Sequence, residues 1–499
     1  MQRPFEKFVA ASKLRVVQSS VLVAILLLVA RRSCQLKFCV TDPDLWWHLK
    51  VGDWILANHA LPHTGIFSRI AEQRPWTAYS WGYEVLLSFA YRCFGIFGVG
   101  VFGVLLTLMV ACAIFLMLHR LSGSFWVAAG LSLVTYFAML FTMMPRPHFF
   151  SIALFCSLIT LIFEARRHSS LTPLFALPLL FLLWANLHIQ FIYGLAVFGL
   201  FVLVNAAQIL LSRFNHTSPS LQPPGLRSGP LLLIFVLAIL ATFVGPNTYH
   251  LYTAILDYSH AKFGYAYIRE LQALDFRFAD HFLQLLLTGA AFFVLGWQKK
   301  TNAFKLLLLL ACALVAFRTT RDGWFICIPA AACLADFFRQ LNQPEQAPQA
   351  NWRLVDYLAS AAVTLLLLIL LFPLSGFTPL ALDSAVARVF PIKAANFLRR
   401  YPPAGPIYNS FGWGGFIIWY LPDYPVAIDG RNDLYGDDLD FRFMRVLNGF
   451  APYAGDAIFR QSRLILLNNQ DYLTTLLARD PRYRLIYRDE LASIFVPLA

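Results

Sequence analysis

Hydrophobic and polar positions change along this chain in whole segments. Polar stretches separate apolar runs at 16–30, 98–118, 125–143, 149–164, 173–188, 190–211, 231–246, 282–297, 303–317, 322–338 and 354–373. A helix needs about 20 apolar residues to cross the hydrocarbon core of a membrane. Several runs approach that length, and shorter ones can tilt or kink. The pattern predicts about eleven membrane spans.

The pattern changes beyond residue 375, where short apolar runs alternate with turn residues. We predict strands at 405–409, 416–420, 425–429, 464–467, 484–487 and 493–496, and helices at 384–400, 437–449 and 470–479. This alternation is typical of a small α/β domain. The predicted fold class is therefore a polytopic α-helical membrane domain over 1–374, with a first outer loop at 31–83, followed by a C-terminal α/β domain over 375–499.

Composition excludes several classes of protein. Of the 499 residues, 59% are hydrophobic and 13% are charged, whereas a soluble domain carries about 25% charged residues. A soluble enzyme, a disordered chain and a disulfide scaffold are excluded. Residues 1–374 carry 27 Lys and Arg against 15 Asp and Glu. These basic residues occur singly between apolar runs, which suits lipid headgroups or phosphates and argues against nucleic acid.

The density of Lys and Arg at the ends of the runs predicts an N-terminus inside the cell. Arg120, Arg166, Arg167 and Arg339 lie in short inner loops under this arrangement. Arg31 and Arg32 argue against it. With an odd number of spans, the C-terminal domain then lies outside the membrane, together with the polar segments 33–81, 247–281 and 318–321.

The first outer loop contains two aspartates on either side of a proline. Asp42 and Asp44 flank Pro43, and the apolar spacing that follows predicts a helix in the headgroup zone with Trp46, Trp47 and Trp54 at its surface. A carboxylate there can act as a general base on an acceptor hydroxyl or hold a divalent cation such as Mg²⁺ or Mn²⁺. It can equally be a helix cap, with Asp44 accepting from the first amides. The residues alone leave both interpretations open.

These features resemble the GT-C superfamily of membrane glycosyltransferases, and in particular a group of uncharacterised bacterial GT-C-like proteins. The resemblance is carried by the run from Asp42 to His48, Trp76, Trp81-Gly-Tyr-Glu84, Arg146-Pro-His148, Trp184 to His188, Pro246 to Tyr249, Asn409 to Gly415, and Asp429-Gly-Arg-Asn-Asp433. It implies a polyprenyl-linked sugar donor and a catalytic carboxylate at Asp42 or Asp44, of which we favour Asp44. It also implies that loop 247–281 helps to bind donor and acceptor.

Other polar positions are candidates for substrate binding. Acidic groups after a strand can bind hydroxyls or a cation, and an arginine can bind phosphate or carboxylate. The predicted substrate-binding residues are His48, Glu84, Asp429, Arg431 and Asp433. A turn-rich loop, in which Asp and Asn bond backbone amides, explains the 429–433 stretch equally well.

Arginines at the ends of spans are candidates for a lipid phosphate site. Arginine makes forked hydrogen bonds to phosphate, which favours Arg146, Arg318 and Arg321, and His188 can bond the same group or carry a proton. The alternative is that the arginines extend to lipid headgroups and that His188 bonds a neighbouring helix.

The leading hypothesis is an inverting glycosyltransferase of the bacterial cytoplasmic (inner) membrane. It would move a sugar from a polyprenyl-phosphate-linked donor to an acceptor (a glycan, a lipid or a protein) on the outer face, with an aspartate as base. The alternatives are a lipid or polysaccharide transporter and a non-catalytic scaffold of an envelope complex. Most polar residues lie at the ends of spans, whereas a transporter carries them at mid-membrane depth.

Overall fold

The computed structural model of the chain describes residues 2–214, 226–298, 302–341, 352–371, 377–403 and 405–498. The chain forms two compact units, each assembled from three separate segments. The helical unit comprises 1–36, 103–245 and 269–376, and the mixed unit comprises 37–102, 246–268 and 377–499. The domain boundary expected between residues 374 and 375 falls outside the described residues.

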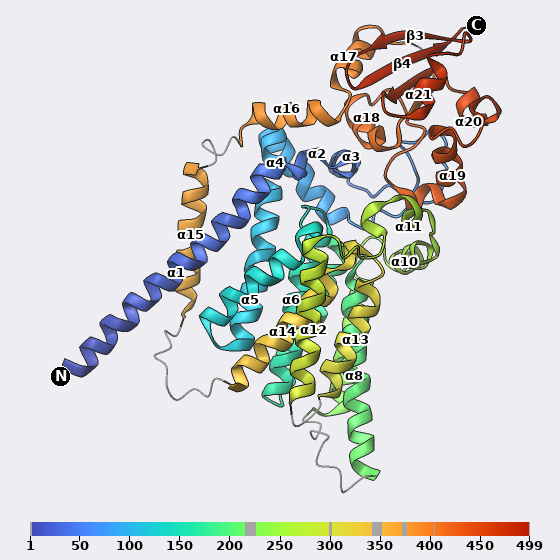
Figure 1. The fold of residues 1–499 in the computed structure, drawn as a ribbon. Helices are drawn as coiled ribbons and strands as arrows, with labels where there is room; N and C mark the ends of the chain where they lie inside the picture. Colours follow the sequence, from blue (N-terminus) through green and yellow to red (C-terminus); the bar gives the residue numbers. More distant parts are fainter. Residues whose placement is uncertain are drawn as a thin grey trace. The chain divides into compact units, whose positions relative to one another are not determined.

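Long apolar helices make up the helical unit (Figure 1). They are α1 (Gln2–Leu36), α5 (Phe125–Ala138), α6 (His148–Arg167), α7 (Leu177–Leu187), α8 (Phe191–Phe214), α9 (Ser228–Thr242), α12 (Ala279–Trp297), α13 (Ala303–Ala316), α14 (Trp324–Leu341) and α15 (Leu354–Leu371). Helix α4 (Trp81–Ser122) belongs to both units and is kinked at Gly95, where φ is 60°. Short 3₁₀ turns η1 (Leu140–Thr142), η2 (Thr172–Ala176), η3 (Arg269–Leu271) and η4 (Thr320–Asp322) connect the helices.

Every predicted apolar run corresponds to an apolar helix in the described residues. Six of these helices are long and apolar enough to cross a membrane, namely Lys13–Thr41, Trp81–Ser122, His148–Arg167, Phe191–Leu211, Ala279–Trp297 and Thr320–Leu341. Five are shorter, at Phe125–Ala138, Thr172–Leu187, Ser228–Thr242, Ala303–Ala316 and Leu354–Leu370. The last two residues of the run expected at 354–373 lie outside the described residues. The predicted fold class, a polytopic helical membrane protein with a small C-terminal sheet, is confirmed.

Packing within the helical unit relies on small residues where helices approach closely. Gly194 on α8 faces Trp184 on α7, and a Cβ at position 194 would lie 2.4 Å from the indole ring. Many leucines point away from these contacts and remain exposed, including Leu232, Leu233 and Leu240 on α9. An apolar outer surface of this kind suits a hydrocarbon environment, in which the helical backbone satisfies its own hydrogen bonds.

The mixed unit contains one small sheet with helices packed around it. Its helices are α2 (Phe38–Thr41), α3 (Pro43–Asn58), α10 (His250–His260), α11 (Phe263–Tyr267), α16 (Pro379–Val389), α17 (Ile392–Arg400), α18 (Gly414–Tyr420), α19 (Asn432–Leu447), α20 (Ala457–Arg460) and α21 (Tyr472–Leu477). Short 3₁₀ turns lie at Phe411–Trp413 and Tyr453–Gly455. The strands are β1 (Ile407–Asn409), β2 (Leu464–Asn468), β3 (Tyr483–Arg488) and β4 (Ala492–Pro497).

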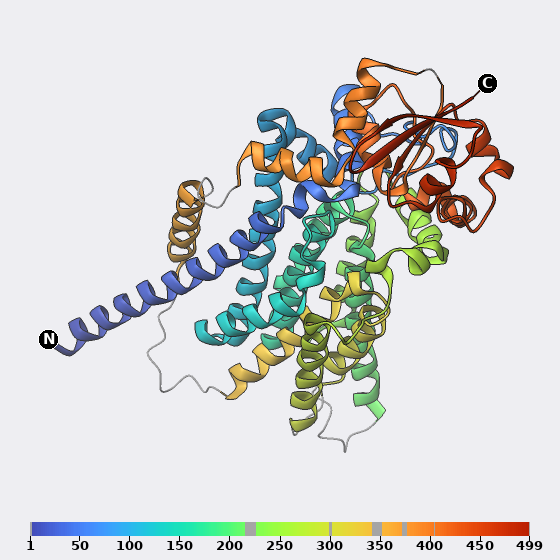
Figure 2. The same ribbon diagram turned by 45° about the horizontal axis from the view of Figure 1, so that its top comes forward.

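The sheet has the strand order β1-β2-β4-β3. Its strands β3 and β4 are drawn in red close to the C-terminus in Figure 2. Strands β1 and β2 are parallel, with Ile407 opposite Leu464, and the other two pairings are antiparallel, with Ile465 opposite Phe495. Central strand β2 is an apolar run buried on both faces, as expected of a strand covered on each side. Four of the six predicted strand regions are thus confirmed.

Two predicted strands and one predicted helix differ in the structure. Residues 416–420 form helix α18, because Gly414 and Gly415 allow it to pack closely on the backbone of neighbouring segments, and a short apolar run does not by itself distinguish strand from helix. Residues 425–429 make only a single bridge, between Val426 and Ser68. The helix expected over 384–400 breaks between α16 and α17 at Phe390, which is extended because Pro391 follows it.

Candidate active site

Helix α3 opens with a capping residue from the aspartate pair. Asp42 is extended (φ −70°, ψ 125°), its Oδ1 accepts a hydrogen bond from the Asp44 backbone N at 3.1 Å, and Pro43 starts the helix. Asp42 is therefore the cap, which decides against the alternative in which Asp44 caps the helix. The reason is that Pro43 has no N–H to satisfy and fits the first helical position. Asp44 lies within the first turn instead.

Asp44 lies against the Asp429-to-Asp433 stretch, which is distant in sequence. Its Oδ1 accepts a hydrogen bond from Trp47 Nε1 at 3.2 Å. A Cβ placed on Gly430 would lie 2.1 Å from the same oxygen, so only glycine leaves room for the carboxylate there. The side chain of Asp44 is half-buried. The structure thus brings the first outer loop and the C-terminal acidic stretch together within the mixed unit.

The tryptophans of α3 do not face outward as expected. Trp46 and Trp47 are 4% and 5% exposed. Trp46 packs edge-on against Phe390 and Phe416 of the C-terminal segment, with ring centroids 5.6 and 5.4 Å away. These two indoles are therefore covered by protein, and the sequence of the loop does not reveal the apolar partner that covers them; Trp54 is partly exposed.

A fully buried ion pair lies beneath Asp44. Arg431 donates to Asp429 through Nε (2.9 Å to Oδ1) and Nη2 (2.7 Å to Oδ2), and both side chains are 0% exposed. The hydroxyl of Tyr435 donates to the same carboxylate at 2.7 Å. Burial lowers the pKa of Arg431, but Asp429 outweighs this effect and the net shift is upward. Asp429 and Arg431 therefore form a buried ion pair with no exposed side-chain surface, and this pair positions the residues around it.

Asp433 follows on α19 and is bonded to the first outer loop. Trp76 Nε1 donates to Asp433 Oδ2 at 3.0 Å, and the Arg431 guanidinium lies 4.9 Å from the centroid of the Trp76 ring. Burial raises the pKa of Asp433 to about 6, although Arg431 opposes the shift. A partly exposed carboxyl group that titrates close to neutral pH has the property required of a general acid or base.

His48 and Glu84 form a buried dyad near this cluster. His48 Nδ1 lies 3.0 Å from Glu84 Oε1, and the residues are 6% and 1% exposed. The imidazole stacks on Trp47 with ring centroids 3.5 Å apart. Arg431 and Asp433 are close enough to act electrostatically on Glu84. Seven of the predicted site residues therefore lie in the mixed unit, namely Asp42, Asp44, His48, Glu84, Asp429, Arg431 and Asp433.

Sequence reasoning missed two further aspartates on α19. Asp440 is fully buried, and neither carboxylate oxygen has a hydrogen-bond partner among the described residues. Burial raises its pKa to about 8, and Asp429, Asp437 and Asp433 add to the shift. Asp437 accepts from the backbone N of Lys262 and of Phe263 at 2.8–2.9 Å. Helix α19 is kinked at Gly436 (φ 71°, ψ 163°), so Asp433 lies on a separate helical segment. The three-residue spacing of 437 and 440 was the available signal that these two acids share a helix face.

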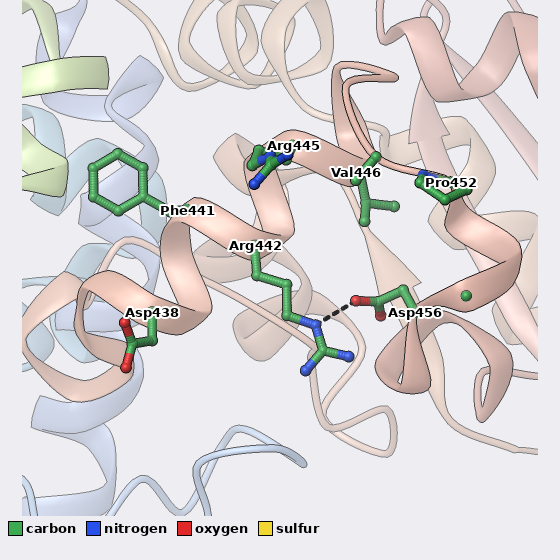
Figure 3. A pocket seen from close by; sticks show the side chains of 9 residues that line it. Asp438, Phe441, Arg442, Arg445, Val446, Pro452 and Asp456 are labelled. Atoms are coloured by element: carbon green, nitrogen blue, oxygen red, sulfur yellow. Dashed lines mark hydrogen bonds and ion pairs between the residues drawn. The ribbon is translucent and has the colours of Figure 1, made fainter.

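An open cavity of about 460 Å³ lies beside the C-terminal half of α19 (Figure 3). It is lined by Asp438, Phe441, Arg442, Arg445, Val446, Ala451, Pro452, Gly455 and Asp456. The Arg442 side chain extends to Asp456, with Nε 2.6 Å from Oδ2. The lining thus offers both donors and acceptors without net charge, a combination that suits a polyhydroxylated ligand.

The helical unit holds a separate cluster of basic residues. Arg146 Nη1 lies 2.8 Å from Glu270 Oε1, and Arg321 Nη1 lies 3.5 Å from the same oxygen. Arg318 is exposed and makes no side-chain hydrogen bond or ion pair among the described residues. The structure therefore unites two of the three predicted phosphate-binding arginines.

His188 bonds within the helical bundle. Its Nδ1 lies 2.8 Å from Ser151 Oγ, which also accepts from Trp184 Nε1 at 2.7 Å. Sequence reasoning missed a buried carboxylate in this unit, Asp322, which accepts from Gln190 Nε2 at 2.8 Å and from Tyr193 and Thr319. Among the described residues, no group of three or more His, Cys, Asp or Glu side chains is arranged to hold a metal ion.

Comparison with known proteins identifies the fold. No protein-family model matches the sequence, and no curated protein matches it. Among solved structures, the mycobacterial arabinofuranosyltransferase AftD matches 95% of this chain and 40% of its own, at 13% identity and a TM-score of 0.51. ArnT from Cupriavidus metallidurans bound to undecaprenyl phosphate matches 96% of this chain and 98% of its own, at 12% identity and a TM-score of 0.47.

The likeness to AftD concerns the fold alone. The chain has a fold similar to that of the membrane arabinofuranosyltransferase AftD, in line with the resemblance that its sequence carries to GT-C glycosyltransferases. The alignment spans less than half of AftD, so the activity of that larger protein does not transfer with the fold.

Proposed function

We propose that the chain is a GT-C-type glycosyltransferase that moves a sugar from a polyprenyl-phosphate-linked donor to an acceptor hydroxyl. The reaction takes place on the outer face of a bacterial cytoplasmic membrane, with the N-terminus in the cytoplasm and the C-terminal domain outside. The fold supports the class of enzyme, and the resemblance of the first outer loop supports the class of donor. The basic residues at the ends of spans supply suitable partners for a lipid phosphate.

The position of Asp44 is the observation that carries the proposal. Asp42 is engaged in capping α3, whereas Asp44 is half-buried in the first turn with Oδ1 aligned by Trp47 Nε1. A carboxylate held in this way has a defined direction, which a general base requires. Asp44 is therefore the proposed base, and Asp42 positions it by fixing the start of the helix.

The proposed chemistry is a single displacement with inversion at the anomeric carbon. Asp44 takes the proton of the acceptor hydroxyl as its oxygen attacks that carbon. The bond between the anomeric carbon and the phosphate oxygen breaks, and the electron pair leaves on the phosphate. Arg146 and Arg321 hold the phosphate and stabilise the charge that develops on it.

The remaining predicted residues divide into two roles under this proposal. Asp433 and His48 are the groups assigned to the sugar hydroxyls, because a carboxylate and an imidazole accept and donate in the pattern that hydroxyls need. Asp429, Arg431 and Glu84 are positioning residues, because their side chains are buried, and Glu84 orients His48. A divalent cation is not required by any step described above.

The test is a transfer assay with purified protein in native-like lipid. The substrates are a panel of polyprenyl-phosphate sugars and a membrane extract as acceptor, and products are followed by mass spectrometry. Asp44→Asn should lower the rate by about 10²–10⁴-fold, the usual effect of losing a general base. Asp53→Asn is the matched control on the same helix, because Asp53 pairs at the surface with Arg92 at 2.7 Å.

Three outcomes separate the possibilities. Loss of turnover in Asp44→Asn with retention in Asp53→Asn supports the proposal. Equal turnover in both variants removes Asp44 from the chemistry. No turnover of any donor by the wild-type protein, in the presence or absence of Mg²⁺ or Mn²⁺, argues instead for a non-catalytic scaffold or a transporter with this fold.

A further inference from the structure

The two arginines assigned to the lipid phosphate are already bound to an internal anion. Glu270 Oε1 lies 2.8 Å from Arg146 Nη1 and 3.5 Å from Arg321 Nη1. All three side chains are partly exposed, at 20% for Glu270, 11% for Arg146 and 26% for Arg321. One carboxylate oxygen thus occupies the position between two guanidinium groups that a phosphate oxygen would take.

Glu270 is an anion throughout the physiological range of pH. Burial acts to raise its pKa, but the charges of Arg146 and Arg321 outweigh burial and bring the pKa down to about 2. Protonation therefore does not remove this carboxylate from the arginines at neutral pH. A ligand can displace the Glu270 carboxylate only if its oxygens accept stronger hydrogen bonds from the two arginines.

The segment that carries Glu270 is short and lies beside the turn that carries Arg321. Glu270 belongs to the three-residue turn η3, and Arg321 belongs to η4. The two turns are joined at one point, where Thr320 donates from its backbone N (2.8 Å) and from Oγ1 (3.0 Å) to the carbonyl of Gln272. The Glu270 side chain can therefore leave the two guanidinium groups without movement of this backbone contact.

We propose that Glu270 is a place-holding carboxylate which the lipid phosphate displaces, and which thereby sets the affinity of the enzyme for polyprenyl phosphates. This inference rests on the proposed function, because it concerns the same arginines. The donor phosphodiester carries one negative charge and several acceptor oxygens, so it can satisfy both guanidiniums at once.

The same competition acts on the product. Cleavage of the bond between the anomeric carbon and the phosphate oxygen leaves a phosphate monoester, which gains a second ionisable oxygen. This product binds two arginines more strongly than the donor does. Glu270 offers the arginines another partner as the product departs, and it therefore limits product inhibition.

The experiment measures binding of a polyprenyl phosphate in detergent micelles to the full-length protein. Glu270→Gln keeps the shape of the side chain and removes its charge, so it should bind the lipid about tenfold more tightly than the wild type. It should also show stronger inhibition by polyprenyl phosphate in the transfer assay. A variant that is merely damaged would bind less tightly, so a gain in affinity cannot arise from misfolding.

Glu164→Gln is the matched control in the same unit. Glu164 pairs with Arg167 at 2.7 Å and has 14% exposure, similar to Glu270, but it has no part in the proposed phosphate site. This variant should leave lipid affinity unchanged. A polyprenol without phosphate, tested in parallel, should bind equally to the wild type and to Glu270→Gln.

The outcomes distinguish this inference from the proposed function. If Arg146→Gln weakens lipid binding but Glu270→Gln does not strengthen it, the place-holding role is wrong and the phosphate site stands. If Arg146→Gln binds the lipid as the wild type does, the phosphate site itself is wrong. Inorganic phosphate that competes with the lipid at equal concentration would identify a site for free phosphate and overturn the lipid assignment.

Discussion

Asp44 and Gly430 lie 386 positions apart in the sequence, yet they are in direct contact in the mixed unit. A Cβ on Gly430 would lie 2.1 Å from Asp44 Oδ1 and 3.3 Å from Trp47 Nε1. The missing side chain at position 430 therefore makes the space in which the carboxylate and its indole partner meet.

Gly430→Ala should displace the Asp44 carboxylate. The added methyl group cannot occupy the position of Oδ1, so α3 or the 429–433 stretch must shift, at a cost of about 1–3 kcal/mol for an overpacked site. We expect Gly430→Ala to have a lower melting temperature than the wild type. We also expect its transfer rate to fall, in the same direction as that of Asp44→Asn. Gly412→Ala is the control, because a Cβ there meets nothing within 4 Å. Equal behaviour of the two alanine variants would contradict the contact.

Asp429→Asn should destabilise the mixed unit strongly. Arg431 would keep its charge in a fully buried position and lose its paired carboxylate, a change that costs about 3–5 kcal/mol. Thermal unfolding followed by the fluorescence of buried tryptophans such as Trp76 measures the effect. Glu490→Gln breaks the exposed pair with Lys393 and should leave the melting temperature unchanged. A melting temperature for Asp429→Asn within error of this control would show that the buried pair does not support the fold.

The sequence predicted the positions of the apolar helices correctly, because a long apolar composition alone determines that structure. Each apolar run became an apolar helix because a long hydrophobic segment has few other stable arrangements in a bilayer. It was less informative for short runs. The apolar pattern of residues 416–420 predicts a strand, but the segment forms a helix. Gly414 and Gly415 allow this helix to approach α3 closely, because a Cβ at position 415 would lie only 2.7 Å from Pro43 O.

The residues of the candidate site were predictable as a set, but their partners were not. Asp44 stood out as an acid at the start of a predicted helix, His48 through the resemblance, and Asp433 as an acid that follows a predicted strand. That Asp42 rather than Asp44 would cap α3 depends on backbone geometry at Pro43. The partnership of Glu270 with Arg146 depends on a tertiary contact between a loop and the start of a span, for which no local pattern exists.

Asp437→Asn should loosen the contact between α19 and the segment 262–267. The carboxylate accepts from the backbone N of Lys262 and of Phe263, which begins α11, and an amide side chain can satisfy these donors with one oxygen only. We expect about tenfold faster hydrogen exchange over residues 262–267, measured by mass spectrometry. Asp438→Asn changes an exposed neighbour without such bonds and should leave the exchange unaltered. Unchanged protection in Asp437→Asn would show that other contacts hold the loop.

Asp440 should make the stability of the mixed unit depend on pH. Its carboxyl group is buried without a hydrogen-bond partner among the described residues, faces Asp429, Asp437 and Asp433, and is countered by Arg74. These surroundings raise its pKa from 3.8 to about 8. Because the folded state binds the proton more tightly than the unfolded state, the contribution to stability is fully present below pH 3.8 and is lost as the pH rises through 8.

Asp440→Asn tests this pH dependence directly. At pH 5 the folded wild-type carboxyl group is protonated and resembles an amide in size and charge, and most of its contribution to stability is still present, so the two melting temperatures should lie closer together than at pH 8.5. At pH 8.5 the variant should melt about 2–4 °C higher, because it carries no buried carboxylate to ionise. Asp438→Asn, an exposed aspartate two residues away, should follow the wild type at both pH values. A variant that is destabilised equally at both pH values would instead indicate that the Asp440 carboxylate has a bonding role that its position does not suggest.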